Sequence, residues 1–249
     1  MKAWQRYFHI MQEVVQKALD TQESNLLKAA EILTNCTLNG GIIHAFGAGH
    51  SGLVTEDVFW RSATLANVHA IFESSVSGIN EITKTSYMEK AEGLGEIIVD
   101  YQRLQPQDAM ITISNSGNNA VTIEVAEAAR KRGIPVIAIT NVAYSDHLRT
   151  LHSSGKKMKD FADVVLDNCS LIGDSAVQIE GLEIKVGATS TIPTVFLLNA
   201  LLVQTAENLV KLGHQPDVYY NGHLTHDSNI AKENNDRLVD KYFYRMRNL

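Results

Sequence analysis

FGAGHSG, residues 46–52, follows a short apolar run and opens into a stretch of helical character at residues 53–65. A second string of the same design, SNSGNN at residues 114–119, also follows an apolar run and opens into a helical stretch at residues 120–132. Small residues let the backbone turn sharply and expose its N–H groups, while the helix behind them adds partial positive charge and the hydroxyls add donors. Two such loops predict a pocket for an anionic ligand that carries many hydroxyl groups.

Five short apolar segments alternate with helical segments from residue 41 onward. This pattern is typical of an α/β protein, a three-layer sandwich in which helices cover both faces of a parallel sheet. In such sheets ligands bind outside the carboxyl ends of the strands, at a topological switch point, and both loops fall there. The expected strands are residues 42–46, 68–72, 109–114, 136–140 and 163–166.

Helical extensions are expected at both ends of the chain. Near the start, apolar residues recur at intervals of three and four, and residues 21–24 are expected to separate this helix from a second one. Residues 191–212 predict a long helix that begins with a hydroxyl cap and a proline, residues 231–246 predict an amphipathic helix, and residues 175–186 alternate like a small hairpin. We expect one compact domain, with an arm at 1–37, a central domain at 38–215 and an extension at 216–249, packed on the same domain or on a neighbouring subunit.

Charge and cysteine content exclude several classes of function. The net charge is −6, whereas nucleic acid and anionic membranes require a basic surface, so neither is an expected partner. The two cysteines, Cys36 and Cys169, are too few for a disulfide framework or a CxxC metal site, which fits a reducing cytosol. Residues 1–16 lack the apolar core of a signal peptide, and the most apolar stretch, residues 192–203, is too short to span a bilayer. We expect a soluble, cytoplasmic protein.

The first loop also matches the G-x-G-x-x-G fingerprint of dinucleotide-binding proteins, through Gly47, Gly49 and Gly52. An acid, Glu73, stands at the end of the second expected strand, somewhat beyond the usual interval of about 20 residues. A dinucleotide fold has no need of a second hydroxyl-rich loop at the third strand. The second loop therefore weighs against a nicotinamide cofactor, although the first loop alone does not exclude one.

The second loop has two interpretations. Ser114 and Ser116 offer hydroxyl groups on either side of Asn115, and a phosphate dianion seated there would gain several charge-assisted hydrogen bonds, each worth roughly 1.5–3 kcal/mol. Ordinary helix capping by Asn118 or Asn119 is the alternative, because serine and asparagine are common at such junctions. One hydroxyl suffices for a cap, so several consecutive polar positions around a glycine favour ligand binding.

The two strings together resemble the sugar isomerase (SIS) domain family of phosphosugar-binding proteins. The more specific is ITISNSGNNAVTIEVAEAARKRGIPVIAITN, residues 111–141, and the resemblance covers about residues 35–215. Over its whole length the chain is similar to the UPF0309 proteins, themselves loosely similar to phosphoheptose isomerases. This resemblance implies a five-stranded parallel sheet in flavodoxin-like order and a homodimer or homotetramer, often with a neighbour's residues completing the site.

The resemblance also implies the substrate-binding residues. By this resemblance the sugar phosphate would be held by Ser51, Ser114, Ser116 and Asn119, and the polar helix start at residues 190–191 would line the same pocket. The glycines of the first loop and His50 are candidates from their place in that loop, where His50 could contact phosphate or sugar. His50 can equally be a simple turn residue. The expected substrate-binding residues are Gly47, Gly49, His50, Ser51, Ser114, Ser116, Asn118, Asn119, Ser190 and Thr191.

Aldose–ketose isomerisation needs a base that moves a proton between adjacent carbons and an acid for ring opening. Glu73 lies where the isomerase domains of glucosamine-6-phosphate synthases carry a glutamate base, although a solvated or capping acid is an equal alternative. Phosphoheptose isomerases use a glutamate on the helix after the first loop, where this chain has Arg61. His214, just past the long helix, is the candidate for ring opening.

The tail contains further histidines and acids, namely His223, His226, Asp217 and Asp227, but their spacing matches no metal motif. We expect no metal and no cofactor. The sequence thus predicts a phosphosugar isomerase acting through an enediol. Its alternatives are a regulatory module that senses a phosphosugar without chemistry, and a lyase resembling the N-acetylmuramic acid 6-phosphate etherases.

Overall fold

The computed structural model describes residues 1–78, 82–223 and 228–249. Its centre is a five-stranded parallel sheet with the strand order β2-β1-β3-β4-β5, which confirms the expected α/β architecture and flavodoxin-like order. The strands are β1 (Ile43–Gly47), β2 (Val68–Ala70), β3 (Ala109–Ile113), β4 (Val136–Thr140) and β5 (Val164–Asp167). Every residue of β1 to β4 is buried, as continuous apolar runs require in a sheet covered on both faces.

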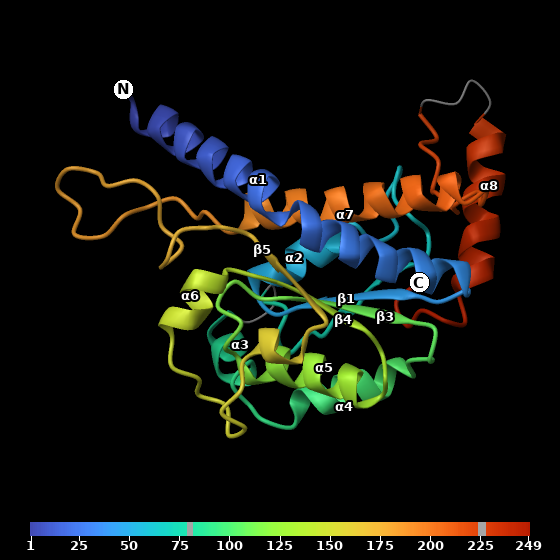
Figure 1. Ribbon diagram of the computed structural model, residues 1–249, viewed down its shortest axis with the longest axis horizontal. Helices are drawn as coiled ribbons and strands as arrows, with labels where there is room; N and C mark the ends of the chain where they lie inside the picture. Colours follow the sequence, from blue (N-terminus) through green and yellow to red (C-terminus); the bar gives the residue numbers. More distant parts are fainter. Residues whose placement is uncertain (79–81, 224–227) are drawn as a thin grey trace.

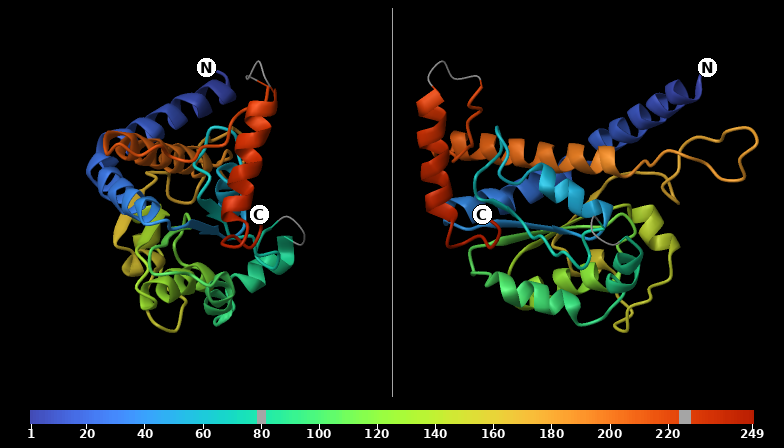
Figure 2. Two further views of the ribbon diagram at one scale, coloured as in Figure 1. Left: turned by 90° about the vertical axis from the view of Figure 1, so that its right-hand side faces the viewer. Right: turned by 180° about the vertical axis from the view of Figure 1, so that it is seen from behind.

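Helices cover the two faces of the sheet (Figures 1 and 2). One face carries α1 (Ala3–Leu38), α2 (His50–Asp57) and α7 (Thr191–Lys211), and the other carries α4 (Leu94–Gln102) and α5 (Ala120–Lys131). Successive side chains along a strand point to opposite faces of the sheet, so the core has two halves. Ile111 packs in the half with α1 and α7, and Met110 packs in the half with α4 and α5. The shorter elements are α3 (Ile82–Met88), α6 (Val142–His147) and the 3₁₀ turn η1 (Met158–Phe161).

The expected break at residues 21–24 is wrong, because α1 continues through it as one helix of 36 residues. The Thr21 hydroxyl donates to the carbonyl of Lys17 at 2.7 Å, so it is satisfied inside the helix. The next residue, Gln22, accepts a hydrogen bond at 3.0 Å from the backbone N–H of Asp167 at the end of β5. This contact anchors the middle of α1 on the sheet, and local helix propensity does not decide its course.

The helix expected at residues 53–65 is also wrong in its bounds, since α2 begins at His50 and ends at Asp57. Beyond it Trp60 and Ala63 adopt left-handed backbone conformations, with φ of 46° and 67°. The following residues pair with the tail instead, because the N–H groups of Ala63 and Ala66 donate to the carbonyls of Tyr219 and Asp217. A partner distant in sequence thus ends the helix early.

The extension folds against the amino-terminal edge of the sheet. Its helix α8 (Ser228–Tyr242) begins and ends slightly earlier than expected, and Leu238 and Tyr242 bury their side chains beside Ile42 and Ala66. The segment expected to form a hairpin keeps only one bridge, between Val177 and Val186, in the long loop before α7. In the part of the chain that the structure describes, no helix is both long and apolar enough to cross a bilayer.

Candidate functional site

The two loops that the sequence singles out lie side by side at the carboxyl edge of the sheet. Gly47 at the end of β1 pairs with Ile113 at the end of β3, so the chain leaves both strands at the same level. Because β1 and β3 are neighbours on opposite sides of the switch in strand order, this is the place where open α/β sheets bind ligands. The structure therefore confirms that the two loops converge.

The first loop depends on its glycines. Gly49 adopts a left-handed conformation (φ 57°) and its N–H donates to the carbonyl of Val76 at 2.7 Å. A Cβ atom at Gly47 would lie 2.6 Å from the carbonyl carbon of Ser51, so only glycine lets α2 start directly against the end of β1. His50 is exposed, and the hydroxyl of Ser51 makes no hydrogen bond with any described residue.

The second loop turns through Gly117 (φ 59°), whose N–H donates to the Ser114 hydroxyl oxygen at 3.1 Å. Asn119 is the N-cap of α5, yet its side chain makes no capping bond, so the capping interpretation is wrong in this detail. Within the described residues, the Ser116 hydroxyl and the backbone N–H groups of Ser116, Asn118 and Asn119 have no acceptor. These free donors at the start of a helix suit an anion.

The two asparagines have other partners. Asn118 donates to the carbonyl of Arg149 at 2.9 Å, while its own amide oxygen is buried without a partner among the described residues. Asn119 forms a side-chain hydrogen bond with Glu89, and the pKa of Glu89 is nevertheless raised because burial penalises its charged form. These hydrogen bonds tie the two asparagines of the second loop to neighbouring segments and so help to hold the loop in place.

A buried polar network supports the second loop from below. The amide oxygen of Asn115 accepts hydrogen bonds from Asn168 at 3.1 Å and from the Ser170 hydroxyl at 2.9 Å. Asn141 also donates to Ser170, and Asn168 reaches the hydroxyl of Thr194 on α7. Sequence reasoning missed this network, although polar residues directly after the fourth and fifth strands were a signal for it.

The start of α7 lies beside the first loop. The Ser190 hydroxyl donates to the carboxylate of Asp174 at 2.9 Å, so it neither caps the helix nor remains free for a ligand. Thr191 is exposed and its hydroxyl has no partner among the described residues. Thr191 lines a small crevice of about 30 Å³ together with His50, Ser51 and Asn115. The expected approach of residues 190–191 to the loops is therefore seen.

Glu73 lines a larger pocket of about 320 Å³ on the other side of α2. One of its carboxylate oxygens accepts hydrogen bonds from the Ser75 backbone N–H at 3.1 Å and from the Ser75 hydroxyl at 2.7 Å. Gly47 and Gly52 contribute bare backbone to the same pocket, so Glu73 and the first loop share one cavity. The sequence analysis missed four polar residues of this cavity, Thr55, Glu56, Ser74 and Ser77.

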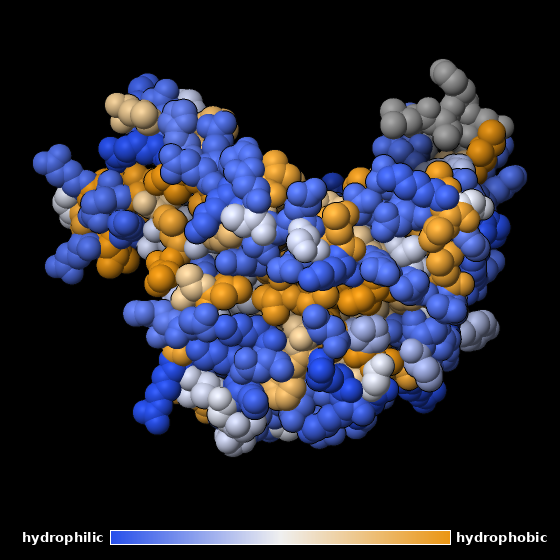
Figure 3. All heavy atoms as spheres, viewed as in Figure 1, coloured by the Kyte–Doolittle hydropathy of each residue, from blue (hydrophilic) through white to orange (hydrophobic). Residues whose placement is uncertain are grey.

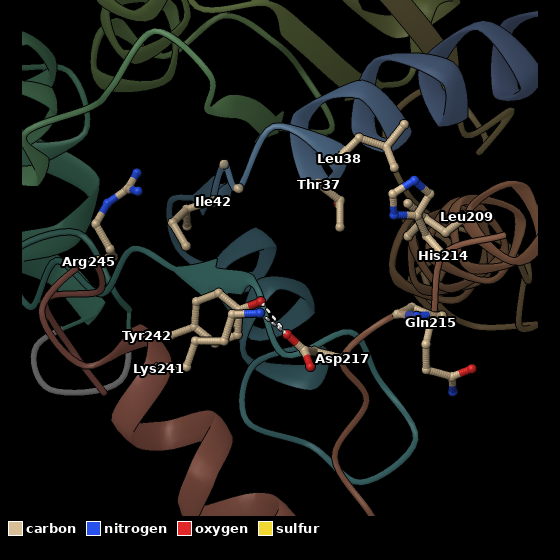
Figure 4. A pocket seen from close by; sticks show the side chains of 13 residues that line it. Thr37, Leu38, Ile42, Leu209, His214, Gln215, Asp217, Lys241, Tyr242 and Arg245 are labelled. Atoms are coloured by element: carbon tan, nitrogen blue, oxygen red, sulfur yellow. Dashed lines mark hydrogen bonds and ion pairs between the residues drawn. The ribbon is translucent and has the colours of Figure 1, made fainter. Parts of the chain in front are cut away.

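His214 is not brought to the loops. It follows the carboxyl end of α7, a helix about 30 Å long by its 21 residues, and the loops lie at the other end. Figure 4 shows it in a separate pocket of about 300 Å³ with Asp217, Lys241 and Arg245, beside the start of β1. Within one chain His214 therefore cannot open the ring of a sugar held by the loops, and that assignment is wrong for a site built from one subunit.

A buried chain of polar groups lies close to this second pocket. The Nδ1 atoms of His44 and His69 are 3.0 Å apart, and His44 Nε2 is 3.3 Å from the carboxylate of Asp108. Arg245 donates to the same carboxylate at 2.7 Å. Burial lowers the pKa of His69 to about 3 and also lowers the pKa of His44. Both imidazoles are neutral, and this network fastens the end of the chain to the sheet.

Among the described residues, no group of three or more His, Cys, Asp or Glu side chains is arranged to hold a metal ion. Two members of the tail set considered above, His226 and Asp227, lie outside the described residues. Asp217 is engaged by Lys241, Arg237 and the hydroxyl of Tyr242.

Parallel strands in the order 2-1-3-4-5 with a serine-rich loop after β3 are the arrangement of the SIS domain, a phosphosugar-binding fold. The SIS domain family matches residues 6–141, and the chain belongs to this family. Within it the chain is similar to the UPF0309 proteins. A UPF0309 protein of Halalkalibacterium halodurans is 34% identical over 95% of this chain and 96% of its own length. Another, of Caldanaerobacter subterraneus subsp. tengcongensis, is 32% identical over 98% of each chain.

Solved structures share the fold at low sequence identity. A phosphoheptose isomerase from Neisseria gonorrhoeae superposes with a TM-score of 0.54 at 20% identity, over 80% of this chain and 95% of its own. The Vibrio vulnificus NanR protein complexed with ManNAc-6P has a TM-score of 0.51 at 17% identity, over 97% of this chain and 69% of its own. At these identities the likeness concerns the fold alone.

Proposed function

We propose that this protein binds a sugar phosphate at the carboxyl edge of its sheet and interconverts an aldose and a ketose through an enediol. The observation that carries the proposal is the row of donors on the second loop that have no acceptor among the described residues. This loop adjoins the first loop, whose Gly47 and Gly52 line the cavity of Glu73. The phosphate would accept hydrogen bonds from Ser116, Ser51 and the backbone N–H groups at the start of α5. Anchoring a group that does not react positions the carbons that do.

Glu73 is the proposed base. The two hydrogen bonds from Ser75 hold one of its oxygens, so the carboxylate has a defined orientation, and its second oxygen has no partner in the described part of the chain. It would take the proton from C2 of the open-chain aldose and return it to C1. The NanR protein, which shares this fold, is complexed with ManNAc-6P, in line with binding of a phosphosugar. The rival function is a phosphosugar sensor that binds its ligand without chemistry.

The first experiment is a thermal melt against a panel of aldose and ketose phosphates, with the dephosphorylated sugars and NADH as controls. A ligand at about 100 times its Kd stabilises the folded state by about 2.7 kcal/mol, a shift of roughly 5–10 °C for a chain of this size. A shift with one phosphosugar, and none with its dephosphorylated form, supports the site. A shift with NADH alone would refute it and restore the dinucleotide interpretation.

The second experiment separates isomerase from sensor. In D₂O an isomerase exchanges the C2 hydrogen of its substrate, which NMR detects, and Glu73→Gln should abolish that exchange while the melting shift remains. A sensor shows the shift without exchange. An etherase-type lyase also exchanges C2 but releases a second product.

We further expect a homodimer or homotetramer, acting in the cytoplasm. The loop before α7 joins the start of α1, where the Tyr7 hydroxyl donates to the carbonyl of Ala188 at 2.7 Å. Together they project from the carboxyl edge of the sheet, and Figure 3 shows hydrophobic residues gathered on this projection. Its exposed apolar side chains include Trp4, Phe8 and Ile184. A neighbouring subunit would cover this surface, and light scattering after size exclusion measures the mass directly.

A further inference from the structure

The cavity that Glu73 lines contains a second carboxylate, that of Glu56 on α2. Gly52, Thr55 and Glu56 stand at positions i, i+3 and i+4, so they share one face of the helix. That face forms one wall of the cavity, and the segment after β2, which carries Phe72 and Glu73, forms another. Two carboxylates from different elements therefore border a space of about 320 Å³, at the lower end of the range for small-molecule sites.

Within the described residues, neither carboxylate has both of its oxygens engaged in hydrogen bonds or ion pairs. Glu56 is exposed, and its carboxylate makes no hydrogen bond or ion pair with any described residue. Arg61, which lies beyond the end of α2, pairs with the neighbouring Asp57 and donates to it at 2.7 Å. Ser75 binds one oxygen of Glu73, and the other has no partner among the residues that the structure describes. One carboxylate is thus held in place and the other can move.

The floor of the cavity distinguishes Glu56 from an ordinary solvated glutamate. Gly47 and Gly52 present bare backbone there, and Gly47 has no room for a Cβ atom. The walls add the side chains of Thr55, Ser74 and Phe72, which offer both polar and apolar contact. A ligand that enters this space touches the face of α2 from which Glu56 rises.

We propose that Glu56 is the second acid–base group of the isomerisation, and this inference rests on the function proposed above. Glu73 takes the proton from C2 as the C2–H bond breaks, and the electron pair forms the C1–C2 double bond. Protonated Glu56 donates its proton to the carbonyl oxygen on C1, which gives a neutral enediol. Glu56 then removes the proton from the oxygen on C2, and Glu73 returns its proton to C1. Both groups end as they began, so no cofactor or redox partner is needed.

The test compares Glu56→Gln with Glu73→Gln and with Glu31→Gln, a control that removes an exposed carboxylate from α1. Each variant is melted against the sugar phosphate panel, and deuterium exchange and isomerisation are followed by NMR. Removing a general acid or base costs roughly 10²- to 10⁴-fold in rate. Glu56→Gln should therefore lose at least about 100-fold in isomerisation, keep the melting shift and lose one limb of the pH–rate profile. Glu56→Asp should recover part of the rate, which a merely structural role does not predict.

The outcomes separate this inference from the proposed function. No exchange by the native protein with any member of the panel overturns both. Native exchange and isomerisation that survive Glu56→Gln within about threefold overturn the role of Glu56 alone. If isomerisation requires Glu56 but survives Glu73→Gln, the role of Glu56 stands and the assignment of Glu73 as the base is overturned.

Discussion

Lowering the pH from about 7.5 to about 5 should destabilise this protein through a buried histidine in its sheet. His69 lies in β2, with Nδ1 against His44 and Nε2 buried without a partner in the described part of the chain. Burial penalises its protonated form most, followed by repulsion from His44, and lowers its pKa from 6.5 to about 3. The folded protein therefore keeps this imidazole neutral where the unfolded chain protonates it.

The sign and size follow from proton linkage. A depressed pKa in the folded state means that the unfolded state binds more protons between about pH 6.5 and pH 3, so stability is full above this window and falls within it. At about 1.4 kcal/mol per unit, the loss from His69 amounts to about 2 kcal/mol at pH 5 and about 5 kcal/mol below pH 3. The pKa of His44 is lowered too, which adds loss of the same sign. Asp108, whose pKa is lowered from 3.8, loses its contribution only in more acidic solution.

Urea unfolding at the two pH values measures this loss, with the free energy extrapolated linearly to water. The native protein is compared with His69→Gln, whose amide can still donate to His44, and with His9→Gln, which removes an exposed histidine from α1. His69→Gln should reduce the pH-dependent loss by about 2 kcal/mol at pH 5, and His9→Gln should leave it unchanged. Equal pH dependence in the native protein and His69→Gln would refute the reasoning.

Two further predictions concern the loops and the end of the chain. Ser116→Ala should weaken binding of a sugar phosphate by roughly 10- to 100-fold in calorimetry, because one hydrogen bond to a charged group is lost. The melting temperature without ligand should stay unchanged. Unaltered affinity would place the phosphate elsewhere. Arg245→Met should lower the urea-unfolding free energy by about 3–5 kcal/mol, because the carboxylate of Asp108 is only 1% exposed and loses its cation. Lys241→Met is the control, since its partner Asp217 lies nearer the surface and keeps Arg237, so a cost under about 1 kcal/mol is expected. Equal costs for the two variants would contradict the buried network.

The elements that hydrophobic pattern and turn chemistry determine were predictable. The five strands were found because each is a short apolar run that ends in polar or glycine residues. The first loop was found because Gly47 and Gly49 are required by close approach and by a left-handed backbone. Errors arose where a distant segment overrides local preference: Gln22 anchors α1 through its expected break, and Tyr219 ends α2 early.

In the candidate site, too, features set by neighbouring residues were predictable, and contacts between distant residues were not. The second loop carries its chemistry in consecutive residues, so its hydroxyl and N–H donors could be recognised without knowledge of the fold. The network beneath it joins Asn115 to Asn168 and Ser170, which are more than 50 residues away, and no local pattern connects them. Within one chain, His214 is kept from the loops for the same reason, because the length of α7 carries it to the opposite edge of the sheet.

By itself, the sequence determined the class of fold, the two loops and the family, because apolar period, glycine and hydroxyl chemistry act over a few neighbouring residues. Only the tertiary structure decided which side chains share a cavity. Glu56 and Glu73 stand on different segments and line one cavity because β1 and β2 are adjacent and α2 begins immediately after β1. Strand order and the packing of helices set such distances, and they depend on the whole chain.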